Sequence, residues 1–380
     1  MTSAEPHHHS SHRQLLRPDR AGPGSLDAII VPTNRPVSFI SAAMRLAGEL
    51  DCLLLVLCSR WSTASLVINE ADRAGVRAVA VDVPPRARLP RPGADALLAG
   101  RTAAPRSGST AGPRAWRRRG LPFRSRTDTS MKRNVGLAVA HMMPGWRAVL
   151  FLDDDVAVSA DDVRGAAGLL GEYDAVGLEN TGYPDNSVVC HANRAVGAVQ
   201  DTFIGGGALL VPTSSRSYFP NVYNEDWFFL FEHIRERRVA VTGLADQKAY
   251  DPFDGPGRAR RQEFGDCLAE GVFELLDDGR DLADAGHGFW SDYLDRRGAF
   301  IDGIMAQLPP DAEGVRMRRA LRAAQESREK ITPQLCVDYL AAWQRDRQAW
   351  DDFLAGLPKL SDVHAALRHL SLRPTGGGQE

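Results

Sequence analysis

The chain has 380 residues, which is enough for two or three domains with a sizeable buried core. Hydrophobic residues make up 43% and charged residues 25%, so the composition excludes a collagen-like chain and one disordered from end to end. Lys and Arg number 46 against 48 Asp and Glu, a net charge of −2, and this balance gives no reason to expect nucleic acid as a partner.

The spacing of the cysteines and the length of the apolar stretches indicate in which cellular compartment the protein is expected. The five cysteines are scattered and form no CxxC pair or zinc-type cluster. No apolar stretch approaches the ~20 residues of a membrane helix, and the first residues lack the apolar region of a secretory signal. We therefore expect a cytoplasmic protein without a transmembrane segment, its cysteines serving as buried apolar residues.

The first third of the chain reads as a flexible tail followed by alternating strands and helices. Residues 1–25 have no periodic apolar face and are expected to be flexible. Apolar runs predict buried strands at residues 26–31, 53–57 and 76–83. Helical spacing of apolar residues predicts helices at 37–50 and 63–74. The β-α-β-α-β order predicts a parallel sheet with helices on its faces.

Residues 84–127 interrupt this pattern. They are rich in Pro, Gly, Ala and Arg and contain a single acid, Asp95. Two interpretations stay open: a flap that binds an anionic ligand, or a solvated insertion without a binding role.

Regular patterning resumes after this insertion. Helices are expected near 130–143, at 160–173 and from Asn224, with strands at 148–152, 175–178, 208–211 and 239–242. Residues 261–370 are expected to be mainly helical, and 371–380 to be a disordered tail.

The most informative segment is an apolar strand that ends in three carboxylates, Asp153, Asp154 and Asp155. Ligands of open parallel sheets bind at the carboxyl ends of the strands. Side chains alternate along a strand, so Asp153 and Asp155 are expected to point the same way and to share one hard divalent cation. Without a cation or a basic partner, three adjacent carboxylates after a buried strand would repel one another.

Other enzyme classes that carry an acidic motif after a strand or on a helix match the surrounding residues less well. An aspartyl-nucleophile phosphatase needs Thr or Val, and a prenyl-transfer enzyme needs Asp, at the position that Ala157 occupies. The turn after the first strand lacks the Gly-rich loop of a sugar nucleotidyltransferase, and no phosphate-binding P-loop is present.

Five short segments together resemble GT-A fold glycosyltransferases similar to family 2. They are VPTNRP at 31–36, KRNVGL at 132–137, FLDDD at 151–155, GGGA at 205–208 and NEDW at 224–227. The resemblance implies a Rossmann-like α/β fold with a mostly parallel sheet over residues 26–260 and a helical extension over 261–370. It also implies a nucleotide-diphosphate sugar as donor, an acceptor that the sequence does not identify, and Mn²⁺ or Mg²⁺ as cofactor.

The resemblance assigns roles to residues at the strand ends. Asp153 and Asp155 are expected to hold the metal, with Asp154 beside the donor. The donor candidates near the base, ribose or phosphates are Pro32, Thr33, Asn34, Arg35, Arg133 and Asn134. Asp82, at the end of the third strand, is a further candidate by position alone. For Arg133 an ordinary ion pair at a helix start stays open as an alternative.

In inverting members, the Asp of the E-D pair takes the acceptor's proton. Here that residue is Asp226, with Glu225 beside it, while the glycines Gly205, Gly206 and Gly207 and the aromatic Trp227 are expected to line the sugar and acceptor pocket. Helix capping by residues 224–226 is compatible with this role. One departure concerns the His that many metal-dependent members carry further on, because the matching segment reads Ala-Asp-Gln-Lys at 245–248.

Three functional hypotheses follow. The first is a metal-dependent, inverting glycosyltransferase with Asp226 as general base. The second keeps the fold but retains the anomeric configuration. The third is a non-catalytic nucleotide-sugar binder or scaffold, which the missing His and the Arg-rich insertion motivate.

Overall fold

The computed structural model describes residues 15–18, 22–84, 87–98, 128–198 and 204–376. These residues form a mixed nine-stranded sheet in the order β5-β8-β6-β7-β4-β1-β2-β3-β9. The strands are β1 (Ala28–Thr33), β2 (Leu53–Cys58), β3 (Ala78–Asp82), β4 (Ala148–Leu152), β5 (Val156–Val158), β6 (Ala175–Asn180), β7 (Ala208–Pro212), β8 (Val239–Gln247) and β9 (Pro374–Thr375).

Most of the sheet is parallel in direction. β1 pairs in parallel with β2 and β4, β2 with β3, and β6 with β8. β7 is antiparallel to both of its neighbours, β4 and β6. The two edge strands, β5 and β9, are also antiparallel to the strands they pair with. This mostly parallel α/β sheet with helices on its faces confirms the fold class that the sequence predicts.

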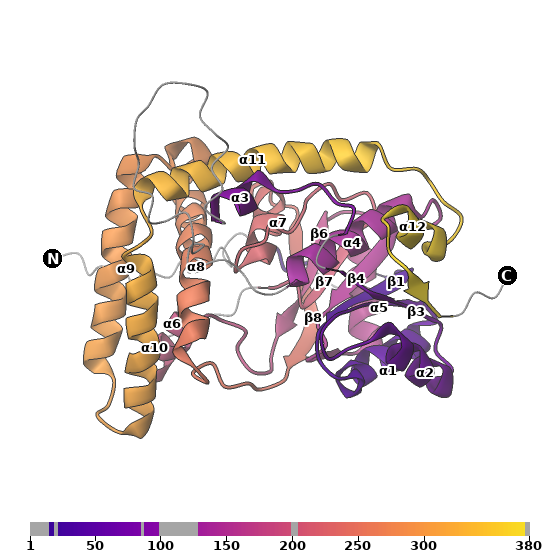
Figure 1. Cartoon of the computed structure of the whole chain (residues 1–380), viewed down its shortest axis with the longest axis horizontal. Coiled ribbons are helices and arrows are strands. Elements are labelled where there is room, and N and C mark those ends of the chain that lie inside the picture. The colour runs from indigo at the N-terminus through magenta and orange to yellow at the C-terminus, as the bar shows by residue number, and fades with distance from the viewer. Residues whose placement is uncertain (1–14, 19–21, 85–86, 99–127, 199–203, 377–380) are drawn as a thin grey trace.

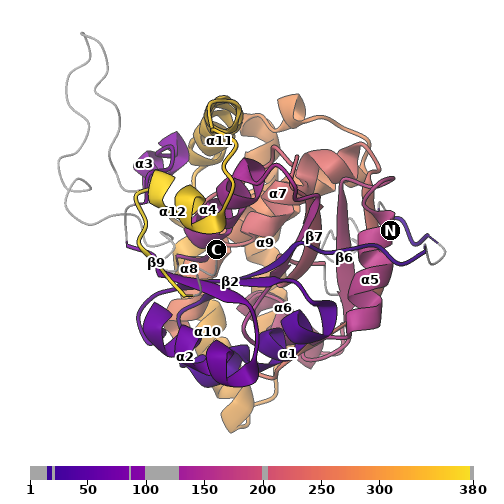
Figure 2. The same cartoon turned by 90° about the vertical axis from the view of Figure 1, so that its right-hand side faces the viewer.

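Alternation along the strands divides the core into two layers. Ile30, Leu55 and Phe151 point to one face of the sheet, whereas Ile29 and Leu150 point to the other. One face is covered by α1 (Ser41–Leu50), α2 (Ala64–Ala74) and α5 (Ala160–Leu169), and the other by α4 (Thr129–Met142), α7 (Glu225–Arg235) and α12 (Val363–His369). Figure 2 shows α1 and α2 on the opposite side of β2 from α4 and α12.

A helical region stands beside the sheet (Figure 1). It contains α8 (Pro256–Asp277), α9 (His287–Gln307), α10 (Ala312–Arg328) and α11 (Pro333–Ala355), together with the short 3-10 helix η4 (Leu282–Asp284). α6 (Val188–Ala195) packs with α8, α9 and α10 in a separate apolar cluster. α11 extends from this region along the molecule and contacts α3 (Gly93–Leu98). No helix within the described ranges is long and apolar enough to cross a membrane.

Within the helical region, Arg297 holds α9 to α8 by a buried ionic cluster. Its guanidinium donates to Glu263, Asp266 and Glu270, all on α8, over distances of 2.8 to 3.2 Å. Burial and the neighbouring carboxylates raise the pKa of Asp266 to about 7. Without Arg297, three buried carboxylates would be left without their basic partner, which would destabilise the fold strongly. Arg297 therefore fixes how α8 and α9 meet.

The structure departs from the sequence expectations in several elements. α6 and β5 were not expected, and β8 continues to Gln247. Residue Leu16 bridges to Ala240, so part of the expected N-terminal tail joins the sheet. Pro374–Thr375 form β9 against β3 within the expected C-terminal tail, and α3 lies within the expected loop 84–127. Within these three segments, residues 1–14, 19–21, 85–86, 99–127 and 377–380 lie outside the described residues.

Candidate functional site

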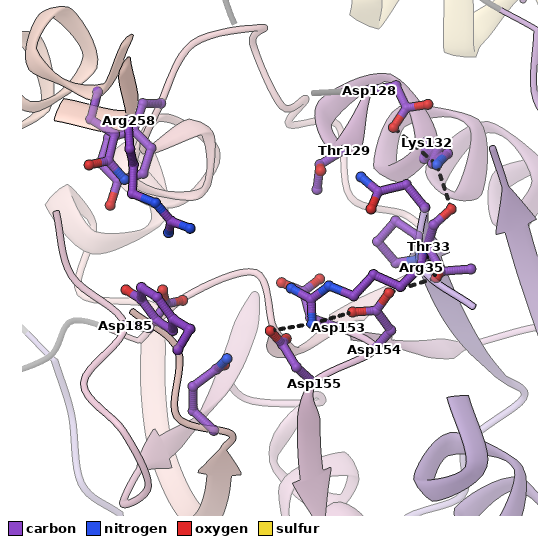
Figure 3. A pocket seen from close by; sticks show the side chains of 16 residues that line it. Thr33, Arg35, Asp128, Thr129, Lys132, Asp153, Asp154, Asp155, Asp185 and Arg258 are labelled. Atoms are coloured by element: carbon purple, nitrogen blue, oxygen red, sulfur yellow. Dashed lines mark hydrogen bonds and ion pairs between the residues drawn. The ribbon is translucent and has the colours of Figure 1, made fainter. Parts of the chain in front are cut away.

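A cavity of about 240 Å³ lies at the carboxyl ends of β1 and β4 (Figure 3). One side, the sheet wall, consists of Pro32, Thr33, Asn34, Arg35, Asp128, Thr129, Lys132, Asp153, Asp154 and Asp155. The other side, the helical wall, consists of Asp185, Tyr223, Tyr250, Arg258 and Gln262. Gln247 of β8 completes the lining. In Figure 3, Asp185 and Arg258 lie across the opening from Arg35 and the three aspartates.

On the sheet wall, the residues after β1 bind those after β4. Thr33 Oγ1 donates a 2.6 Å hydrogen bond to Asp154, and Arg35 Nη1 lies 3.2 Å from Asp154 and 2.7 Å from Asp155. Burial raises the pKa of Asp154 to about 6, against the opposing effects of the Thr33 hydrogen bond and the Arg35 charge. The three aspartates lie in the turn after β4, and all of them line the cavity. The alternation expected of a continuing strand therefore does not apply to them.

Lys132, in the first turns of α4, fixes the end of β1 on the sheet wall. Its Nζ donates to the carbonyl of Thr33 at 2.7 Å and to the hydroxyl of Ser59 at 2.8 Å, and it lies 3.0 Å from Asp128. Burial lowers the pKa of this ammonium. Lys132 thereby joins β1, β2 and α4 at the cavity floor.

Arg133 points behind the sheet wall and links two of the predicted motifs. Nη2 donates to both oxygens of Asp153 at 2.9 and 3.1 Å, and Nη1 donates to Glu225 at 2.8 Å. A Cβ on Gly206 would lie 2.5 Å from the guanidinium carbon, so glycine is required for this approach. Burial raises the pKa of Glu225 to about 8 and also raises that of Asp153. Arg133 thus pairs with acids from two distant segments and does not line the cavity.

Asp226 lies in the first turn of α7, behind the glycines that precede β7. Its two oxygens accept hydrogen bonds from the backbone N–H of Gly206 at 2.8 Å and of Trp227 at 3.0 Å. Asn224, before the helix, has φ +62° and donates its side-chain amide to Asp266 of α8. Neither Asp226 nor Glu225 lines the cavity.

Four other groups of predicted site residues also lie outside the cavity lining. The side-chain amide of Asn134 makes two hydrogen bonds to the backbone of Phe219: it donates to the carbonyl and accepts from the N–H. Asp82 accepts from the N–H of Ala64 at the start of α2. Trp227 is buried against Phe273. The three glycines are also absent from the lining: Gly205 lies next to Asp226, Gly206 next to Arg133 and Gly207 next to Asp153.

The helical wall was missed by reasoning from sequence. Asp185 is exposed in the loop before α6, and its oxygens accept no hydrogen bond from the residues that the structure describes. Tyr250 donates to the carbonyl of Asn186 and contacts His191, which is buried in α6. No motif marks these positions, because loops and the start of α8 bring them to the cavity only after folding.

The carboxylate oxygens of Asp153 and Asp155 are the donor type that Mg²⁺ and Mn²⁺ prefer. Among the described residues, no three acidic, His or Cys side chains are arranged to hold a metal by themselves. Mg²⁺ commonly binds through one or two carboxylates together with substrate phosphates and water. The pair on the sheet wall fits a cation held in that way, with Arg35 and Arg133 now neutralising the two carboxylates.

Comparisons with known proteins give partial structural similarity. No family model and no curated protein matches the sequence. Glucosyl-3-phosphoglycerate synthase from Mycobacterium tuberculosis, solved with Mn²⁺, uridine diphosphate and phosphoglyceric acid, is similar at 13% identity and a TM-score of 0.39, over 65% of this chain and 78% of that one. TarS 1–349 from S. aureus, solved with UDP-GlcNAc, is similar at 13% identity and a TM-score of 0.36, over 85% and 92%.

Mannosyl-3-phosphoglycerate synthase from Rubrobacter xylanophilus is a third similar structure. Its identity to this chain is 12% and its TM-score 0.38, over 68% of this chain and 76% of that one.

Proposed function

We propose that this chain is a glycosyltransferase that moves a sugar from a nucleotide-diphosphate sugar to an acceptor. The observation that carries the proposal is the sheet wall, where the residues after β1 and the three aspartates after β4 line one cavity and bind each other. A ligand at this wall would meet Thr33, Asn34 and Arg35 with one end and the aspartates with the other. That arrangement suits a molecule with a nucleoside at one end and a diphosphate at the other.

Each charged group has a distinct task in this proposal. Asp153 and Asp155 would hold a divalent cation, which supplies positive charge to offset that of the departing diphosphate. Arg35 lies beside the same carboxylates, and turning it toward the donor would give the phosphates a guanidinium partner. Arg133 stays behind them and holds Asp153 to Glu225, which fixes the position of α7 against the sheet wall.

Asp226 is the proposed general base of an inverting reaction. Each of its oxygens accepts one backbone hydrogen bond and keeps a lone pair for an acceptor hydroxyl. The base would take the hydroxyl proton as the oxygen attacks the anomeric carbon. If transfer instead retains the configuration, Asp226 orients the acceptor, and NMR of the product anomer distinguishes the two outcomes.

A non-catalytic nucleotide-sugar binder is the second candidate. The observation that favours it is that Asp226 and Glu225 do not line the cavity, although the residues proposed to bind the donor do. This candidate predicts tight donor binding with no turnover on any acceptor.

Thermal unfolding of the protein with a panel of nucleotide-diphosphate sugars tests the proposal. Each donor is added with Mn²⁺, with Mg²⁺ or with a chelator, to the parent and to Asp155→Ala. We expect at least one donor to raise the unfolding midpoint in a metal-dependent way, and the rise to disappear in Asp155→Ala. Asp161→Ala, an exposed aspartate at the start of α5, is the matched control. A midpoint that no donor changes would contradict the proposal.

A further inference from the structure

Arg258 presents a guanidinium to the cavity from the helical wall. Figure 3 shows this side chain directed toward the space between the walls. It lies over the ring of Tyr250, 5.0 Å from the ring centre, and its Nε is 3.7 Å from Asp254. Within the described part of the chain, its two terminal nitrogens donate to no protein acceptor. Arg258 is therefore held in place by an aromatic face and keeps its hydrogen-bond donors for a ligand.

The other cations that line the cavity are already paired. Arg35 lies within 3.2 Å of two aspartates, and Lys132 lies 3.0 Å from Asp128. The acids of the sheet wall thus have basic partners of their own. Arg258 differs from these cations because its terminal nitrogens have no protein acceptor among the described residues.

The start of α8 gives a second, independent reason to expect an anion here. Gly255 caps the helix without a side-chain hydrogen bond, the first turn contains no acid, and Arg258 is its third residue. Helix N-termini carry partial positive charge, so the helix end and Arg258 add positive charge at the same place. An anion bound there is favoured by the guanidinium and by the helix end together.

We propose that the acceptor of this transferase carries a phosphate or carboxylate group, and that Arg258 binds this group on the helical wall. The inference rests on the proposed function, because it takes the sheet wall to be the donor site. Gln262, one turn further along α8, uses its oxygen to accept from Val188 and keeps its amide donors for the same ligand. An acceptor anchored in this way presents its hydroxyl across the opening, toward the sugar at the aspartates.

Calorimetric titration with small probes tests the anion site without requiring turnover. The probes are glycerol 3-phosphate, glycerate and glycerol, which give a phosphate arm, a carboxylate arm and an uncharged arm. Each is titrated into the full chain with and without a saturating nucleoside diphosphate and Mn²⁺. The variants are Arg258→Gln and, as matched control on the same helix, Arg260→Gln, whose guanidinium pairs with Glu326 away from the cavity.

We expect at least one charged probe to bind the parent with the nucleotide present, and glycerol not to bind. Arg258→Gln should weaken that binding at least tenfold, and Arg260→Gln should leave it unchanged. Loss of probe binding when the nucleotide is added would show that Arg258 serves the donor's own phosphates and would overturn the proposal. Equal affinity of the parent and Arg258→Gln, or no binding of either charged probe, would also overturn it.

The two proposals fail differently in this experiment. If no nucleoside diphosphate binds in any condition, the donor site is wrong. The titrations without nucleotide then still report whether Arg258 binds anions.

Discussion

The two walls of the cavity differ in how their charges are satisfied. On the sheet wall, Asp154 and Asp155 lie within 3.2 Å of Arg35, and behind the wall Asp153 is bound by Arg133. On the helical wall, Asp185 and the terminal nitrogens of Arg258 have no such partner among the described residues. The first arrangement is held rigid before a ligand arrives, whereas the second leaves its polar groups to the ligand. This difference is expected if, as proposed, the sheet wall is a preorganised donor site and the helical wall an acceptor site completed by its substrate.

The largest expected effect concerns Asp226, in the first turn of α7. Asp226→Asn keeps the shape of the side chain but removes the proton acceptor and, because an amide nitrogen cannot accept, one of the two backbone hydrogen bonds. The transfer rate should fall about 100- to 10,000-fold. Donor affinity should not change, because Asp226 does not line the cavity. Steady-state rates and donor titrations measure both quantities. The matched control is Asp161→Asn, an exposed aspartate in the first turn of α5, and full activity in Asp226→Asn would refute the role of base.

Arg133→Met tests the rigidity of the sheet wall. The substitution leaves Asp153 and Glu225 without their buried partner, and we expect a loss of about 3–5 kcal/mol in the free energy of unfolding. Arg35→Met is the comparison, because the Arg35 side chain is 40% exposed and its pairs should contribute about 1 kcal/mol or less. Urea denaturation measures both variants, and equal losses would mean that Arg133 has no special structural role.

The raised pKa of Asp154 predicts a pH dependence of stability. The folded value is about 6, above the unfolded value near 3.8, so the folded state holds this proton over a pH range in which the unfolded state has lost it. Raising the pH from 4 to above 6 should therefore destabilise the parent relative to Asp154→Asn, by about 3 kcal/mol at most. Unfolding free energies at several pH values measure the difference. A difference that stays constant with pH would show that Asp154 titrates normally.

The smallest expected effect concerns the close approach behind the sheet wall. Gly206→Ala places a methyl group 2.5 Å from the carbon of the Arg133 guanidinium, and we expect a loss of about 1–3 kcal/mol in unfolding free energy. Gly171→Ala, where nothing lies within 4 Å, should change stability little. If the two variants are equally stable, Arg133 can move without cost and the wall is less rigid than its contacts imply.

The sequence predicts the sheet wall better than the helical wall, for a physical reason. Thr33 ends a buried strand, Arg35 and the three aspartates follow buried strands, and parallel strands bring their carboxyl ends to one edge of the sheet. Asp185 and Arg258 reach the cavity through loops and the start of α8, whose positions depend on packing between distant elements. The sequence also cannot show that Arg133 turns away from the cavity, because that depends on Glu225 and the absence of a side chain at Gly206.

A crystal structure of the protein with Mn²⁺ and a nucleoside diphosphate would test the donor site most directly. The account predicts a cation between the diphosphate and the carboxylates of Asp153 and Asp155, with the nucleoside beside Thr33, Asn34 and Arg35. It also predicts that the space next to Arg258 stays free of the nucleotide. A diphosphate bound to Arg258, or a nucleotide bound outside this cavity, would contradict the assignment of the sheet wall as donor site.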